Sequence, residues 1–340
     1  MNITKRIEQI ESQITSMSKP MYHKREVLPG LLEIQKEMVQ LTFDADYADN
    51  MNLKIYDVVQ HLENKNNELN HIADESLDRF KNECKDFGNL IAREIAGSRG
   101  ERFAKRTLEV LRSNRRMLFN VELKEGDIRT ELDAVVFTSK AIFMIEVKNP
   151  SKDMVIDVKG NYYKAHGYMD FGRNLGEKVN DKSHLLRESL KEIEKPLNIV
   201  ELVVFSNNQI KVENRSKYIK HCFLSQLPHI IDEYNGKDIY ADEDMDFMQS
   251  LVHSAECEEE YPIEFDIAAF KRDFATVVAT LENAVEINRV KAEQTKEVPK
   301  VNIWTKIKDS IKEDPWTYVG GVASIIGGAA VAVTRNRTGR

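Results

Sequence analysis

The chain has 340 residues, of which 41% are hydrophobic and 31% are charged. The apolar share is large enough to bury a core, so wholesale disorder is excluded, and the length predicts about two domains at roughly 150 residues each. Three cysteines without a CxxC pair and eight histidines without an HxxxH pair exclude a disulfide scaffold, a zinc finger and a zinc-protease motif. The net charge of −7 argues against a protein that binds nucleic acid over its whole surface.

Residues 1–95 are expected to form a helical, coiled-coil-like region. Apolar residues recur at alternating spacings of four and three over positions 3–17, which is the a/d seam of an amphipathic helix, and Pro20 ends it. Such helices pack on themselves or on a second copy, so a homo-oligomer is one expected assembly. The charged start of the chain predicts no signal peptide. Further helical periodicity runs through residues 28–39, 53–62 and 69–95.

Residues 96–232 change to an α/β pattern. Gly97 and Gly100 precede a helix that is expected over 101–112, and apolar runs of strand length then follow, with a further helix between them. An α/β fold with helical extensions at both ends is therefore the predicted fold class. The expected strands are 117–124, 131–138, 141–148, 154–158, 199–205 and 218–224, and the second helix is 177–194.

Residues 233–300 are expected to be an acidic helical region that ends in a polar linker. Positions 238–270 hold eleven Asp and Glu and no Lys or Arg, whereas positions 93–129 hold ten Lys and Arg against six Asp and Glu. A modestly basic patch is therefore expected beside an acidic segment. The acidic run 256–260 is expected to be solvated, and the alternative is an acidic partner surface that competes with DNA.

The last segment, residues 301–340, contains an uncharged stretch at 318–333. With its flanks the apolar span becomes about 315–334, and roughly twenty residues are enough to cross a bilayer as a helix. The run Asp-Pro-Trp-Thr-Tyr-Val-Gly-Gly that starts at position 314 resembles the C-terminal anchor of small bacterial inner-membrane proteins. A single transmembrane anchor places the rest of the chain on the cytoplasmic side of the bacterial inner membrane. The alternative is a buried soluble helix or a glycine-rich tail.

Acidic side chains interrupt two neighbouring strands of the expected sheet. Asp133 lies amid Leu, Ala and Val, where a carboxylate is costly without a partner, and Glu146 with Lys148 ends the next strand. Because side chains alternate along a strand, Glu146 and Lys148 point to one side. If residues 138–141 form a tight hairpin, Asp133 falls opposite Glu146, with Cβ atoms about 4.5–5.5 Å apart. Carboxylates that close repel each other unless a cation lies between them, and Mg²⁺ or Mn²⁺ fits that requirement.

This cluster suits metal-assisted hydrolysis of phosphodiester bonds. The ion polarises the phosphate and lowers the pKa of a bound water, while Lys148 orients that water or stabilises the developing charge. Glu101, directly after the glycine pair, is the candidate third carboxylate, because glycines let the backbone approach another element closely. Basic residues nearby are candidates for binding the backbone of a nucleic acid: Arg99, Arg102, Lys105 and Arg106.

The residues of this cluster stand in three motifs: Gly97-x-x-Gly100-Glu101, Glu131-Leu132-Asp133 and Ile145-Glu146-Val147-Lys148-Asn149. Together they resemble the nuclease-related domain (NERD) of the PD-(D/E)xK superfamily, over about residues 96–232. The resemblance implies a restriction-endonuclease-like core, which is a mixed central sheet flanked by helices. It also implies that the three acids bind a divalent metal and that the lysine assists hydrolysis of nucleic acid, which is DNA or RNA.

This sequence departs from the family pattern at three positions. Leu132 replaces a proline of the superfamily, and Asp181 and His184 stand where the family often has proline and glutamine. The contribution of the helix that carries the last two is therefore left open. Glu122 and Glu131 are expected to be solvated.

Two main functions remain after these arguments, and a third possibility is a membrane-tethered structural or stress protein in which the helices act. The first is a Mg²⁺-dependent nuclease that is tethered to the membrane. The second is a scaffold that binds nucleic acid or protein on a nuclease-like fold without catalysis.

Overall fold

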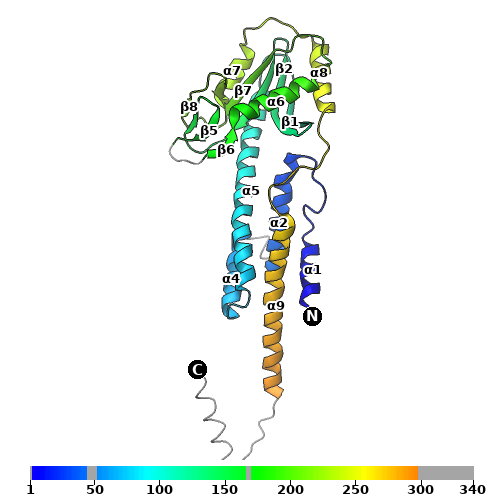
Figure 1. Cartoon of the computed structure of the whole chain (residues 1–340), viewed down its shortest axis with the longest axis vertical. Helices are drawn as coiled ribbons and strands as arrows, with labels where there is room; N and C mark the ends of the chain where they lie inside the picture. Colours follow the sequence, from blue (N-terminus) through cyan, green and yellow to red (C-terminus); the bar gives the residue numbers. More distant parts are fainter. Residues whose placement is uncertain (1, 44–51, 166–169, 298–340) are drawn as a thin grey trace, which may run out of the picture. The chain divides into compact units, whose positions relative to one another are not determined.

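The computed structural model of the chain describes residues 2–43, 52–165 and 170–297 (Figure 1). The chain divides into two compact units, Met1–Asn283 and Ala284–Arg340. The first unit contains a bundle of helices and a part built on β-sheets. Of the second unit, the structure describes only the end of one long helix.

The N-terminal region is helical, as predicted. The first helix is shorter than its apolar seam, because it ends at Gln13 and the backbone turns at Met17, which has a positive φ of 55°. Ile10 and Ile14 are the buried members of that seam. The helices of the bundle are α1 (Ile3–Gln13), the 3₁₀ turn η1 (Lys24–Glu26), α2 (Val27–Thr42), α4 (Ile55–Glu68), α5 (Asp74–Glu109) and α9 (Ile267–Glu297).

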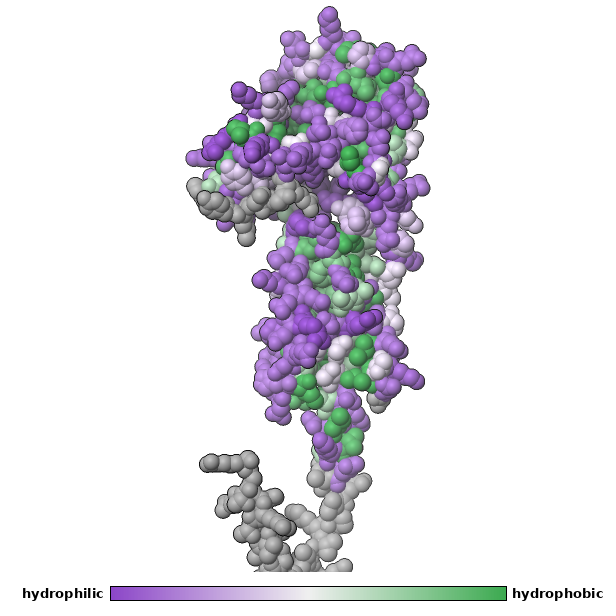
Figure 2. All heavy atoms as spheres, viewed as in Figure 1, coloured by the Kyte–Doolittle hydropathy of each residue, from purple (hydrophilic) through white to green (hydrophobic). Residues whose placement is uncertain are grey.

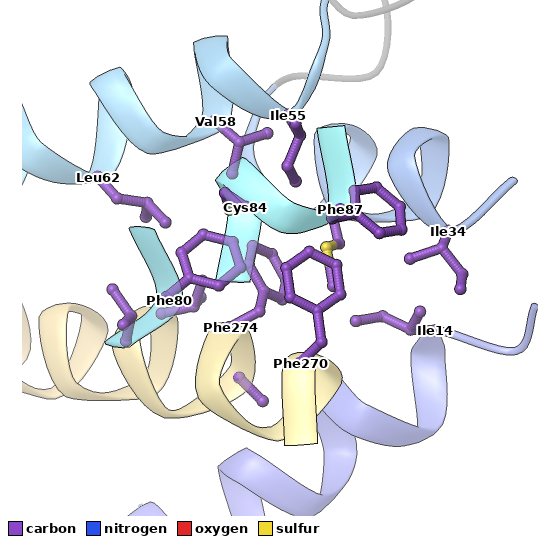
Figure 3. Close-up of a cluster of buried hydrophobic side chains, with 14 of the residues drawn as sticks. Ile14, Ile34, Ile55, Val58, Leu62, Phe80, Cys84, Phe87, Phe270 and Phe274 are labelled. Atoms are coloured by element: carbon purple, nitrogen blue, oxygen red, sulfur yellow. The ribbon is translucent and has the colours of Figure 1, made fainter. Parts of the chain in front are cut away.

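Aromatic side chains join the bundle across a long separation in sequence (Figure 3). The ring of Phe270 on α9 lies 4.6 Å from that of Phe87 and 5.5 Å from that of Phe80, both on α5, measured between centroids. All three side chains are fully buried. The N-terminal helices therefore pack on themselves, together with a helix from the C-terminal part of the chain.

Helix α5 runs without a break from the bundle into the sheet part (Figure 1), although the sequence predicts two helices separated at Gly97. The packing at Gly100 explains why a glycine stands at this position of the helix. A Cβ at Gly100 would lie 2.9 Å from the Cβ of Asn149 and 3.3 Å from Ser206 Oγ, whereas a Cβ at Gly97 would make an ordinary contact of 3.7 Å with Glu101 Oε1. Gly100 thus allows the close approach to the sheet that the sequence predicts.

Substitution of Gly100 by alanine is expected to destabilise the chain by about 1–3 kcal/mol, since an added methyl group has to displace packed neighbours. The matched change Gly97→Ala, one turn earlier in the same helix, is expected to be neutral or to stabilise by up to about 1 kcal/mol. Urea unfolding of both variants measures the difference. Equal stability of the two variants would show that the helix does not touch the sheet at Gly100.

The sheet part confirms the predicted α/β class, with a mixed central sheet flanked by helices. Its five strands have the order β1-β2-β3-β7-β9, in which β1, β2 and β3 are antiparallel and β7 and β9 continue in parallel with β3. A smaller sheet has the order β6-β5-β4-β8. The strands are β1 (Arg115–Glu125), β2 (Ile128–Thr138), β3 (Ile142–Lys148), β4 (Met154–Ile156), β5 (Asn161–Lys164), β6 (Asp170–Asn174), β7 (Ile199–Phe205), β8 (Val212–Asn214) and β9 (His221–Phe223).

Both faces of the central sheet are covered by helices. Val135 and Phe137 enter a core that also contains side chains of α6 and α8, whereas Ala134 and Val136 enter a second core with the end of α5 and with α7. This alternation is the period of two that a sheet buried on both sides requires. The remaining helical elements are α6 (Leu175–Ser189), the 3₁₀ turn η2 (Leu224–Gln226), α7 (Leu227–Asp232) and α8 (Asp242–Ser254).

The hairpin between β2 and β3 has the register that was predicted from its length. Ala134 pairs with Ile145 and Phe137 with Ile142, so the next position along places Asp133 opposite Glu146. The site residues are positioned by this register together with α5 and α6.

The predicted membrane anchor at about 315–334 lies outside the described residues. Within the residues that the structure describes, none of the helices combines the length and the apolar character that crossing a membrane requires. Hydrophilic residues cover most of the face seen in Figure 2, with smaller hydrophobic areas among them.

Candidate active site

A buried lysine lies between the two acids of the hairpin. Lys182, on α6, donates a 2.7 Å hydrogen bond to Asp133 Oδ1 and another to Glu146 Oε2. The side chains of Lys182 and Glu146 are each only 1% exposed. Although burial lowers the pKa of Lys182, the two carboxylates outweigh it, so that this pKa lies above its ordinary value. The cation that the close carboxylate pair requires is therefore supplied by the chain itself.

Two further lysines lie close to the other carboxylate oxygen of Glu146, Oε1. Lys148 Nζ lies 2.5 Å from Glu146 Oε1, and Lys178 Nζ lies 3.3 Å from the same atom. Burial opposes ionisation of Glu146, but Lys148, Lys182 and Lys178 together hold its pKa well below the ordinary value. Burial also lowers the pKa of Lys178 to about 8, against the attraction of Glu146. The Lys148 side chain is 23% exposed and the Lys178 side chain is 34% exposed, so both amines reach solvent near this end of β3.

Sequence reasoning missed Lys182, although a signal was present. Leu175, Val179 and Leu186 form the buried stripe of α6, at spacings of four and seven, and Lys182 stands between the last two in the same stripe. A charged residue at a core position of an amphipathic helix needs a buried partner of opposite charge. Asp133 and Glu146 are those partners.

Glu101 does not join this pair directly. It comes from α5, on the opposite face of the sheet, and its Oε2 accepts a 2.8 Å hydrogen bond from the side-chain amide of Asn120, which donates equally to Glu131 Oε1. Burial and the charge of Asp133 raise the pKa of Glu101, which indicates that the two carboxylates interact electrostatically. The three predicted acids therefore lie in two neighbouring pairs: Lys182 bridges Asp133 and Glu146, and Asn120 bridges Glu101 and Glu131.

A local kink in β1 places Asn120. This residue has a positive φ of 53°, which asparagine adopts more readily than most residues. The neighbouring pairs are Phe119 with Ala134 and Val121 with Leu132, and the first pair faces one core while the second enters the other. The strand therefore changes face at Asn120, beside Asp133.

The expectation that Glu122 and Glu131 are solvated is wrong. The Glu131 side chain is 9% exposed and lies 3.7 Å from Lys24 Nζ of η1, and burial raises its pKa to about 7. The Glu122 side chain is 2% exposed and forms an ion pair with Arg129 at 2.7 Å. Partners from other segments explain the burial of both carboxylates.

Arg129 is the centre of a node that ties two distant segments to the β1–β2 hairpin. Besides Glu122, its guanidinium donates to the backbone carbonyls of Tyr22, Glu259 and Glu260, and the Glu122 carboxylate also accepts from the backbone of Lys24. Residues of η1 are thereby held beside the candidate site.

The acidic run 256–260 is only partly solvated. Glu256 has 14% of its side chain exposed and lies 3.6 Å from both His23 and Arg25, and Glu259 pairs with Lys124. These acids are neutralised by basic residues of the N-terminal segment and of β1, which is why the run packs on the protein.

A pocket of about 420 Å³ lies beside Glu101 and Glu131. Arg102 and Lys105, two of the four predicted nucleic-acid-binding residues, line this pocket. Arg99 and Arg106 are exposed on the same helix and are not among the lining residues. Cations that sequence reasoning did not include come from the N-terminal segment: Lys24 and Arg25.

The carboxylate pair fits a small cation in charge and in donor type. Asp133 Oδ1 and Glu146 Oε2 converge on the Lys182 ammonium, while the other oxygens of the pair accept from the Val147 N–H and from Lys148. Mg²⁺ or Mn²⁺ at that point would be held by Asp133 and Glu146 in exchange for the lysine, with the oxygen ligands that such ions prefer. Among the described residues, no group of three or more His, Cys, Asp or Glu side chains is arranged to hold a metal.

Comparison with known families connects this geometry to a class of protein. Residues 96–206, about a third of the chain, match the family model of the nuclease-related domain, NERD. The match starts where the predicted domain 96–232 starts, includes the three predicted acids and three site lysines, and ends directly after β7. No curated protein and no solved structure matched the chain. The segment 96–206 of the sheet part is therefore similar to nuclease-related domains.

Proposed function

We propose that the chain hydrolyses phosphodiester bonds of nucleic acid, with DNA as the first substrate to test, at the cluster of Asp133, Glu146 and Lys148. The observation that carries the proposal is the register that brings the two carboxylates together beside Lys148 within a segment similar to nuclease-related domains. Mg²⁺ or Mn²⁺ is the proposed cofactor, held by Asp133 and Glu146. Glu101 is an additional carboxylate that interacts electrostatically with Asp133.

Each side chain has a separate task in this proposal. The metal, when bound, polarises the phosphate and lowers the pKa of a water. Glu146 keeps its charge at neutral pH because the surrounding lysines hold its pKa low. Lys148, a partly exposed amine at the end of β3, stabilises the negative charge that develops on the phosphate. Glu101, whose pKa is raised by burial and by Asp133, is suited to accept a proton.

The pocket beside Glu101 is the proposed approach for the substrate strand. Arg102 and Lys105 from α5 and Arg25 from η1 place positive charge around it. Phosphate contacts of this kind position a nucleic acid without reading its sequence, and they weaken as salt concentration rises. Binding that depends strongly on salt and little on base sequence is therefore expected.

The second candidate function is a scaffold that binds nucleic acid or protein without cleaving it. The specific observation in its favour is Lys182, which already neutralises both carboxylates. A site whose counter-cation is a permanent part of the chain does not need a metal in order to fold.

The experiment that separates the two functions uses the purified full chain with end-labelled DNA and RNA. Cleavage that requires Mg²⁺ or Mn²⁺ and stops with EDTA supports the nuclease. Binding of either nucleic acid without cleavage in the presence of both metals supports the scaffold.

Tethering to the cytoplasmic side of the inner membrane is a further part of the proposal, and it rests on the sequence of residues 315–334. Deletion of residues 315–340 is expected to move the chain from the membrane pellet to the supernatant of a bacterial lysate. Full-length chain that stays in the supernatant without detergent would contradict the anchor.

A further inference from the structure

The Asp133–Glu146 pair has a cation of its own, and its position is defined by the chain. Lys182 reaches the pair from α6, and its ammonium donates to one oxygen of each carboxylate. Those two oxygens come from neighbouring strands in register. They are therefore the oxygens that would converge on any small cation at this point.

Among the residues that the structure describes, Asp133 and Glu146 are the hydrogen-bond acceptors of the Lys182 ammonium. Its side chain is 1% exposed, and its neighbours in the α6 stripe are Val179 and Leu186, which belong to the apolar core. A buried ammonium is costly unless it is paired. In the arrangement that the structure describes, Lys182 therefore stays on the carboxylates.

Electrostatic repulsion prevents the Lys182 ammonium and a divalent ion from binding to the Asp133–Glu146 pair at the same time. With Lys148 and Lys178 also on Glu146, the two acids already face three ammonium groups. A divalent ion added to this group would meet strong repulsion at short distance, which is poorly screened inside a protein.

We infer that Lys182 is the resting counter-cation of the Asp133–Glu146 pair and competes with a divalent metal for the same two carboxylate oxygens. This inference rests on the proposed metal dependence of the site. Metal binding is then an exchange in which the ammonium leaves the pair and the ion enters. The affinity of the site for metal is set by how firmly Lys182 is held.

Titration of Mn²⁺ into the metal-free full chain, followed by calorimetry, tests the exchange. The variant Lys182→Met is expected to bind Mn²⁺ about tenfold more tightly or better than the wild type, because the competing charge is gone. The matched variant Lys178→Met removes a lysine one turn away that pairs with Glu146 without bridging the two acids, and it is expected to change the affinity by less than about threefold. Lys182→Gln replaces Lys182→Met if the latter does not fold.

A measurement on the wild type gives a second readout. Reductive methylation followed by peptide mass spectrometry is expected to leave Lys182 unlabelled in metal-free protein and to label it when Mn²⁺ is present. Equal Mn²⁺ affinity of the wild type and the Lys182 variants, with no change in labelling, would overturn the exchange and leave the proposed metal dependence standing. No Mn²⁺ binding by the wild type or by either Lys182 variant would overturn both.

Discussion

Replacement of Glu146 by glutamine is expected to lower the rate of Mg²⁺-dependent DNA cleavage by about 100-fold or more, the size of effect expected when a charged group at the reacting centre is lost. Glu146 is the acid on which Lys148, Lys178 and Lys182 converge, and it is fully buried. Glutamine keeps the shape of the side chain but removes the negative charge. A divalent ion then loses one of the two carboxylates that would hold it, and the three ammonium groups repel it.

Glu125→Gln is the matched control for this substitution. Glu125 ends β1, is half exposed, and faces His184 at 3.2 Å. Its variant is expected to cleave at the wild-type rate. Circular dichroism and thermal melting of both variants separate loss of the site from loss of the fold. Wild-type cleavage by a folded Glu146→Gln chain would place the chemistry elsewhere in the molecule.

Loss of Arg129 is expected to have the largest effect on stability. The substitution Arg129→Met removes one partner of a buried ion pair and leaves the Glu122 carboxylate uncompensated, which costs about 3–5 kcal/mol in such cases. The same change removes the hydrogen bonds to the carbonyls of Tyr22, Glu259 and Glu260. The segments that hold η1 beside the site are therefore expected to loosen along with the hairpin.

Urea unfolding followed by circular dichroism measures the effect of Arg129→Met. The control is Arg215→Met, which removes the arginine of a solvent-exposed pair with Glu213 on β8. Exposed pairs contribute little to stability, so the control is expected to unfold at the wild-type midpoint. Identical midpoints for Arg129→Met and the wild type would show that the node does not stabilise the chain.

Local sequence could predict those parts of the fold in which the interacting residues are close together in the chain, such as single strands and the hairpin between β2 and β3. The strand 199–205 was predicted at its observed bounds, and β2 and β3 differ from prediction by a few residues at their starts. Hairpin length fixed the pairing of Asp133 with Glu146, since register follows from the number of residues in the turn. Local spacing was sufficient for this half of the site.

The remaining features of the site depend on segments that are distant in sequence. Lys182 reaches Asp133 across 49 residues, and Glu131 is buried against Lys24 of an N-terminal turn. Neither contact could be predicted from the spacing of residues within the motifs that contain Asp133 and Glu131. The charged position in the apolar stripe of α6 was the one local indication, and it specifies that a partner exists without saying which acid it is.

Helix α5 shows the opposite case, in which local reasoning predicted a break that packing removes. Glycine is a poor helix former, so Gly97 and Gly100 favour a boundary. At one end of α5, Phe80 and Phe87 pack in the core of the bundle, and at the other end Ala104 packs in the sheet core, so the helix continues through both glycines. Tertiary contacts outweigh a local preference of this size.

The central claim is that the acids of β2 and β3 form one cation site at which a divalent metal exchanges with Lys182. A crystal structure of the full chain soaked with Mn²⁺, with anomalous scattering recorded at the manganese edge, tests it most directly. We expect an anomalous peak between the carboxylates of Asp133 and Glu146, with the Lys182 ammonium moved away from them. A structure at saturating Mn²⁺ without a peak there, and with Lys182 still bonded to both acids, would contradict the claim.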